Sequence, residues 1–182
     1  MTNTTFTAIL DFWFNEITPQ QWWAKDDNFD QLIKDRFLSI HTQAVTGELY
    51  HWRKQTEGRL AEVIIIDQFS RNIFRNKPEA FRWDSMALVL AQEAVALQLD
   101  AQLSTQQRAF LYMPYMHSES LVIHEQAVKL FSQPGLESNL SFELKHKVII
   151  EQFGRYPHRN QLVGRQSTSE EQIFLTKPGS SF

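Results

Sequence analysis

The stretch that decides the fold is TEGRLAEVIIIDQFSRN, residues 56–72. Its run of β-branched residues, 63–66, would also fit a buried strand, because short apolar runs occur in both kinds of element. The residues before this run contain no cluster of turn formers, and apolar positions recur at helical spacing from Leu60 to Phe69. The length and the flanks of the stretch therefore predict one long helix over residues 56–72 rather than a strand.

Apolar periodicity predicts further helices on both sides of this stretch. Those before it are expected from Phe6, from Asp27 and, as a short element, from Leu49, with Gly47 placed to end the second of them. Those after it are expected at residues 78–97, at 104–113, at 114–131 with Pro114 at the first helical position, at 141–153, and after a capping box, Ser167-x-x-Glu170.

This order of elements contains no alternation of strands and helices, so the fold class is predicted to be all-α. We expect a single domain over residues 1–176, built of antiparallel helical hairpins with about eight helices. Residues 177–182 are predicted to form a flexible C-terminal tail.

Composition limits the classes of function. The chain has 182 residues, 42% of them hydrophobic and 21% charged, as expected of an ordinary globular protein. It has no cysteine, which excludes disulfides, thiolate metal sites and cysteine nucleophiles. A net charge of −3 without a basic run argues against nucleic acid as a partner. The first five residues do not resemble a signal peptide and no apolar run is long enough to span a bilayer, so a cytoplasmic protein with no membrane partner is predicted.

One polar motif occurs twice. IDQFSRNIFRN at residues 66–76 and IEQFGRYPHRN at residues 150–160 share six of their eleven positions. On a helix, Gln68, Arg71 and Arg75 project from one face, whereas Pro157 is expected to end the helix in the second copy. The repetition suggests two related helical units whose decorated ends face a common place.

The arginines of both copies lie in segments that contain no acidic residue, 68–78 and 152–169. If the two segments meet, their guanidinium groups form a fork-like site for a carboxylate or a phosphate. The predicted ligand-binding residues are Gln68, Arg71, Arg75, Arg155, His158, Arg159 and Arg165. The alternative is structural: Asp67–Arg71 and Glu151–Arg155 have the spacing of i,i+4 ion pairs, and arginines also bind the last carbonyl groups of helices.

His117 and Glu119 are the candidate catalytic residues. A histidine beside a carboxylate can act as a general acid or base. As a structural alternative, His117 and His124 would be histidines at the edge of the core, bound by a carbonyl or a carboxylate. The spacing of His117 and Glu119 does not place both side chains on one helix face, so no metal site is predicted, and no cofactor is indicated.

Two aromatic clusters, Phe12-Trp13-Phe14 and Trp22-Trp23, fit either a hydrophobic core or an exposed binding surface. Core is the favoured interpretation, because large aromatic side chains dominate core packing.

The polar and aromatic blocks resemble a bacterial family catalogued as domain of unknown function 924. The matching blocks are Leu10-Asp11-Phe12-Trp13-Phe14, Trp22-Trp23-x-Lys25-Asp26, Asp67-Gln68-Phe69-Ser70-Arg71-Asn72, His117-Ser118-Glu119, Phe153-Gly154-Arg155-Tyr156-Pro157-His158-Arg159-Asn160 and Gly164-Arg165-x-Ser167-Thr168-x-Glu170-Glu171. The resemblance implies an all-helical, tetratricopeptide-like array, and it implies no activity or cofactor.

Three hypotheses for function follow. The leading one is a site for a small anionic molecule, carrying a phosphate or a carboxylate, which is bound and, if the protein is an enzyme, hydrolysed or transferred. The second is a non-catalytic module that binds an acidic or C-terminal peptide in a groove between helical hairpins. The third is that the arginine blocks only hold the helices together, which predicts buried carboxylate or carbonyl partners.

Overall fold

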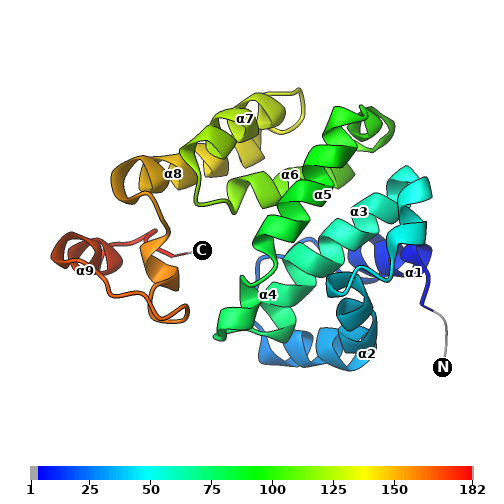
Figure 1. Ribbon diagram of the computed structural model, residues 1–182, viewed down its shortest axis with the longest axis horizontal. Helices are drawn as coiled ribbons and strands as arrows, with labels where there is room; N and C mark the ends of the chain where they lie inside the picture. The colour runs from blue at the N-terminus through cyan, green and yellow to red at the C-terminus, as the bar shows by residue number, and fades with distance from the viewer. Residues whose placement is uncertain (1–3, 182) are drawn as a thin grey trace. The chain divides into compact units, whose positions relative to one another are not determined.

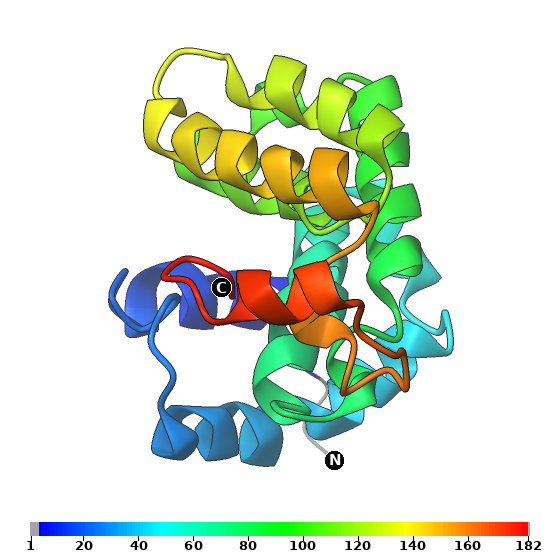
Figure 2. The same ribbon diagram turned by 90° about the vertical axis from the view of Figure 1, so that its left-hand side faces the viewer.

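The computed structural model describes residues 4–181, and every regular element in this range is a helix (Figures 1 and 2). The all-α prediction is therefore confirmed. Contacts group the chain into two compact units, one formed by residues up to 75 together with 79–114, the other by 76–78 together with the residues from 115 onward. The predicted domain boundary at residue 176 stays a prediction. Residues 1–3, and Phe182 at the end of the predicted tail, lie outside the described residues.

The first unit is built around residues 56–72, which were predicted to form one long helix. It forms a continuous helical segment from α3 (Thr56–Ile64) through a π-helical turn, η3 (Ile65–Phe69), to α4 (Ser70–Ile73). Helix α3 packs against α1 (Phe6–Asp11) and α5 (Asp84–Ala96), and α2 (Asp27–Val45) packs against η3 and α4 (Figure 1). Residues 63–66 are fully buried because helices cover the segment on several sides, which explains their unbroken apolar run.

Shorter elements complete this unit. They are the π-helical η1 (Phe12–Glu16) and the 3-10 helices η2 (Tyr50–Lys54), η4 (Pro78–Ala80) and η5 (Leu99–Gln102), followed by α6 (Thr105–Met116), whose last residues enter the second unit. The Thr5 side chain caps α1. Gly47 adopts the left-handed conformation after α2, with a φ of 78°, as expected of a residue that ends this helix.

The aromatic clusters divide between core and surface. Trp13 is completely buried, with its ring 5.5 Å from that of Phe69 and 5.6 Å from that of Phe110. Trp22 is half-buried and donates a hydrogen bond from its indole nitrogen to the carbonyl of Trp13, at 2.9 Å. Trp23, by contrast, is 61% exposed. The core interpretation therefore holds for Phe12 and Trp13, whereas Phe14 is half-buried and Trp23 lies at the surface.

The second unit contains an antiparallel hairpin of α7 (Leu121–Phe131) and α8 (Glu137–Phe153), followed by η6 (Pro157–Arg159) and α9 (Ser169–Leu175) (Figure 2). Gly135 forms the turn between the two long helices, with a φ of 86°. Gly154 ends α8 in the left-handed conformation, which turns the chain away before Pro157, as the sequence predicted.

Four expected helix starts are wrong. Helix α5 begins at Asp84 rather than at residue 78, and α8 begins at Glu137 rather than at residue 141. Pro114 lies inside α6 rather than at the start of the next helix, which begins at Leu121. A proline in the last turn is tolerated because it removes only one hydrogen bond to the preceding turn. The capping box of α9 is formed by Thr168 and Glu171, one residue later than predicted, because the Glu171 carboxylate is also bound by Arg155.

No helix within residues 4–181 is long and apolar enough to cross a membrane. Within the predicted tail, the Ser180 side chain is buried and donates a hydrogen bond to the carbonyl of Leu175, at 3.2 Å.

Candidate functional site

The first copy of the repeated motif lies in the first unit, where Arg71 joins the π-helical turn to the start of α5. Its guanidinium group donates to both carboxylate oxygens of Asp84, at 3.1 and 3.0 Å, and to the backbone carbonyl of Asp67, at 2.8 Å. The predicted i,i+4 ion pair with Asp67 is also present, at 3.1 Å. Gln68 is buried and donates to the Asp67 carboxylate, which is itself completely buried. These contacts are those that the structural hypothesis expects.

Arg75 makes an equivalent contact with α2. Its guanidinium group binds both carboxylate oxygens of Asp30, and Asn72 donates to the same carboxylate at 2.8 Å. The hydrogen bond to Asp30 raises the pKa of Arg75, although partial burial opposes this effect. Arg75 therefore holds the end of α4 to the start of α2.

In the second unit, Arg155 binds the last helix instead of the helix that it follows. It donates from Nε and Nη2 to the two carboxylate oxygens of Glu171, at 2.6 and 2.8 Å, and to the carbonyl of Gln166 at 3.0 Å. The bond from Arg155 is the main reason that the pKa of Glu171 falls to about 2. The predicted pair between Glu151 and Arg155 is not formed: α8 ends at Gly154, and Glu151 pairs with Lys147.

Arg165 binds the predicted acid–base residue Glu119. It donates to the two carboxylate oxygens at 2.5 and 2.8 Å, and the backbone N–H of Tyr156 donates to the same carboxylate at 2.8 Å. Burial alone would raise the pKa of Glu119, but the bonds from Arg165 and Tyr156 and the nearby charge of Arg159 bring the pKa below its usual value. Glu119 is thus held as a carboxylate that fixes the backbone of Tyr156.

Tyr156 is the centre of the remaining polar groups, and its side chain is completely buried. The guanidinium carbon of Arg159 lies 4.5 Å from the centre of the Tyr156 ring, within the range of a cation–π contact. The rings of His158, His146 and His124 lie 5.6, 5.8 and 6.3 Å from the same ring. We call these five residues the Tyr156 cluster: His124, His146, Tyr156, His158 and Arg159.

The deepest part of the cluster is a buried hydrogen-bond chain. Nδ1 of His124 is 2.7 Å from Oε1 of Glu143, and Nε2 is 2.9 Å from the carbonyl oxygen of Ser118. The Tyr156 hydroxyl donates to the carbonyl of Met116 at 2.5 Å. Burial raises the pKa of Glu143, although the bond to His124 opposes this rise.

His117 is one of the residues that influence the pKa of His146. Burial is the main reason that the pKa of His146 falls to about 3, and a hydrogen bond from its Nδ1 to the carbonyl of Phe142, at 2.8 Å, opposes the fall. The positive charges of His117, His124 and Arg159 lower this pKa further. Two of the residues around this point, His117 and His158, are half-buried rather than buried.

Within residues 4–181, no group of histidine, aspartate and glutamate side chains is placed to hold a metal ion. The hollow that the structure forms in the first unit, about 930 Å³, lies between α1 and the first turns of α3 and α6, and none of the predicted site residues lines it.

Comparison with known proteins adds a family. A model of a family described as bacterial proteins of unknown function, DUF924, matches residues 9–179. The chain belongs to the DUF924 family. The solved structure of the protein of unknown function ATU0120 from Agrobacterium tumefaciens is similar to this DUF924 chain at 35% identity and a TM-score of 0.89, with 93% of this chain and 96% of that chain covered. No curated protein matches it.

The DUF924 chain brings some of the predicted site residues together and leaves others apart. Around Tyr156 it gathers Glu119, His158, Arg159 and Arg165, with His117 acting on the same cluster through His146. Arg155 is directed to α9, whereas Gln68, Arg71 and Arg75 belong to the other unit.

Sequence reasoning missed the central role of Tyr156 and did not single out His146. A signal was present for His146, because it shares the buried stripe of α8 with Glu143 and Ile150. Two ionisable residues on an apolar stripe indicate a buried polar network.

Proposed function

We propose that this DUF924 protein binds a small anionic molecule, carrying a carboxylate or a phosphate, at the Tyr156 cluster, and that it does so in the cytoplasm. The observation that carries the proposal is the position of Arg159 over the Tyr156 ring, with His146 and His158 beside the same ring. The guanidinium group of Arg159 favours negative charge, and a neutral imidazole can donate a hydrogen bond to an anion.

The contacts of the acids in this region are consistent with this choice. Glu119 is bound by Arg165, and Glu143 is bound by the ring of His124. His117 and His158, which are half-buried, are the members of this region that an incoming ligand would meet first.

The contacts assign different roles to the predicted residues within this proposal. Arg155 and Arg165 are positioning residues, because each binds a carboxylate of its own unit. Glu119 positions Tyr156, so His117 is the remaining candidate acid–base group if the ligand is hydrolysed or transferred. In the first unit, Gln68, Arg71 and Arg75 serve the packing of helices around Asp67 and Asp30.

The test is a thermal-shift and calorimetric titration with inorganic phosphate, sugar phosphates and small carboxylic acids at low salt. A ligand present at 100 times its dissociation constant adds about 2.7 kcal/mol to the free energy of unfolding. We expect Arg159→Lys, which keeps the charge but loses the fork, and His158→Gln to weaken binding about tenfold each, or about 1.4 kcal/mol. The matched control is Arg36→Lys, since Arg36 pairs with exposed Glu16 in the other unit.

Equal affinity in the folded Arg159→Lys and His158→Gln variants would contradict the proposal, as would the absence of any stabilising anion.

A non-catalytic interaction module is the second candidate, favoured by the exposed apolar side chains of Val122, Leu144 and Val148 on the α7–α8 hairpin. Peptides ending in an acidic residue and a free carboxylate belong in the same titration. Binding of these peptides without binding of the free anions would establish the second candidate instead.

A further inference from the structure

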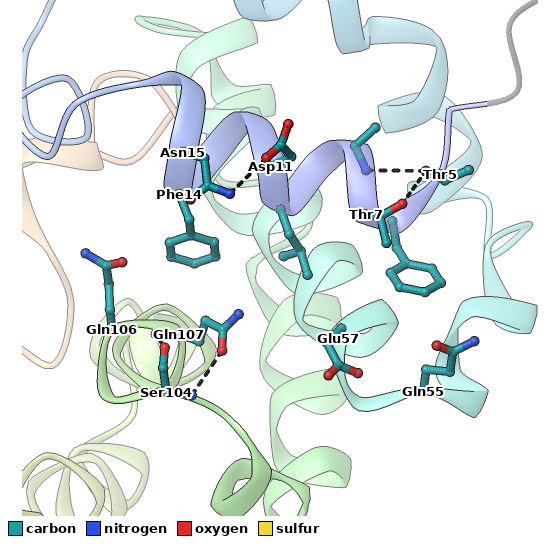
Figure 3. A pocket seen from close by; sticks show the side chains of 13 residues that line it. Thr5, Thr7, Asp11, Phe14, Asn15, Gln55, Glu57, Ser104, Gln106 and Gln107 are labelled. Atoms are coloured by element: carbon teal, nitrogen blue, oxygen red, sulfur yellow. Dashed lines mark hydrogen bonds between the residues drawn. The ribbon is translucent and has the colours of Figure 1, made fainter.

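The first unit contains a hollow that is chemically unlike the Tyr156 cluster. It has a volume of about 930 Å³, is open to solvent, and is bounded by α1 and by the first turns of α3 and α6 (Figure 3). Apolar side chains of α1 contribute to its wall, and the ring of Phe14 is directed toward Gln106 and Gln107 of α6. An open hollow with an apolar wall and polar groups opposite is a usual form of small-molecule site.

The charge of the lining excludes an anionic ligand. Its thirteen residues include two carboxylates, Asp11 and Glu57, and no lysine, arginine or histidine. The other polar side chains are neutral amides and hydroxyls: Thr5, Thr7, Asn15, Gln55, Ser104, Gln106 and Gln107. Amides both donate and accept hydrogen bonds, so this lining is complementary to a ligand that does the same.

Several of these polar groups are available to a ligand. No hydrogen bond joins the side chains of Gln55, Glu57 or Gln106 to another residue of the lining (Figure 3). The Asp11 carboxylate, in contrast, accepts a hydrogen bond from Asn15 at 2.8 Å, and it points away from the Phe14 ring of η1 (Figure 3). The available groups are therefore mostly neutral, which favours an uncharged ligand over an amine.

An aromatic platform continues from the hollow to the surface. The ring of Phe14 lies 5.6 Å from that of Phe110, and Phe110 is stacked with Trp23 at 6.1 Å and an interplanar angle of 10°. Trp23 is thus parallel to and offset from Phe110, and it is 61% exposed. Trp23 does not line the hollow itself, but two successive ring contacts connect it to Phe14, which does. An exposed tryptophan that continues an aromatic row from a polar hollow indicates a binding surface.

We propose that this hollow binds a neutral, polyhydroxylated ligand, a short oligosaccharide that extends from the hollow toward Trp23. The C–H face of a sugar ring is apolar and packs against an aromatic face such as that of Phe14 in the hollow or of Trp23 beyond it. Its hydroxyl groups donate and accept hydrogen bonds, as the amides of Gln55 and Gln106 and the carboxylate of Glu57 require. The site is separate in residues and in charge from the anion site, and neither proposal depends on the other.

The test is saturation-transfer NMR, together with tryptophan fluorescence, on the full chain with glucose, galactose, mannose, N-acetylglucosamine and their disaccharides. We expect at least one of these sugars to bind, and Trp23→Ala and Gln106→Ala each to weaken its binding about tenfold, as the loss of one stacking surface or one hydrogen-bonding group does. The matched controls are Tyr50→Ala, an exposed aromatic residue outside the hollow, and Gln126→Ala, an exposed glutamine of α7, both with unchanged binding.

Each other result overturns the proposal. If no sugar in the set binds, the hollow is not a sugar site. If a sugar binds equally well to the Trp23→Ala and Gln106→Ala variants, it binds elsewhere. If choline or spermidine displaces the bound sugar and Glu57→Gln abolishes that displacement, the hollow selects cations. Because the side chains of Trp23 and Gln106 are exposed, both variants are expected to fold, which circular dichroism checks.

Discussion

The carboxylate of Glu171 accepts hydrogen bonds from Arg155, from Asn160 at 3.2 Å and from the backbone N–H of Thr168 at 2.7 Å. Arg155 is the largest cause of the fall in the pKa of Glu171, from 4.5 to about 2. Because the folded-state pKa lies below the unfolded one, these bonds stabilise the fold fully above pH 4.5 and lose their effect as the pH falls toward 2. Glu171→Gln should therefore lower the stability at pH 7 and reduce its decline between these two pH values, as urea titrations at several pH values would measure.

The exposed neighbour Glu170 provides the control, because Glu170→Gln removes the same charge from the same helix without touching the carboxylate that Arg155 binds. If the two variants had the same pH profile, the partners of Glu171 would contribute nothing measurable. The same contacts explain why the sequence alone misplaced the capping box: the partners of Glu171 are sixteen and eleven residues away, and no local pattern reveals them.

Helix α3 lies very close to the backbone of η2 at Gly58. A Cβ atom added there would lie 2.2 Å from the carbonyl oxygen of Trp52 in η2, closer than such atoms can approach. Gly58→Ala should therefore cost about 1–3 kcal/mol of unfolding free energy, the usual cost of overpacking. Gly47→Ala is the matched control: a Cβ there meets nothing within 4 Å, and the left-handed conformation alone costs about 1 kcal/mol. Urea denaturation measures both, and a smaller loss for Gly58→Ala would show that η2 moves aside.

Helices were largely predictable from the sequence, and their special turns were not. The run from 63 to 66 was correctly predicted as helix because its flanks and length excluded a strand, whereas the π-helical turn at Ile65–Phe69 has no signal in the apolar periodicity. That turn contains Asp67 and Gln68, both of which are buried, so the polar side chains of this motif are internal partners. Charged pairs such as Asp30–Arg75, forty-five residues apart, depend on the tertiary fold and could not be predicted from spacing.

The whole chain divides into two units that each have their own polar network, centred on Asp67 and Asp30 in one and on Tyr156 in the other. The repeated motif contributes one copy to each network, yet the two copies differ locally, because the first continues as helix through α4 and the second ends at Gly154. The sequence singled out the arginines of both networks, but not Tyr156 or His146 in the second. It could not predict that most of the arginines bind carboxylates of their own unit, because those carboxylates lie on other helices.

This division predicts that the units lose structure separately. Tyr156→Phe removes the hydroxyl that binds the carbonyl of Met116 and leaves that buried acceptor without its donor, at a cost of about 1–3 kcal/mol. Native-state hydrogen exchange should then become faster at the amides of α7 and α8 while those of α3 keep their protection. Ile33→Val, a buried change in α2, is the reciprocal control, expected to affect the amides around α3 and to spare α7 and α8. Equal acceleration in both regions for either variant would mean that the chain opens as one cooperative unit, since two separately stable units would not share the loss.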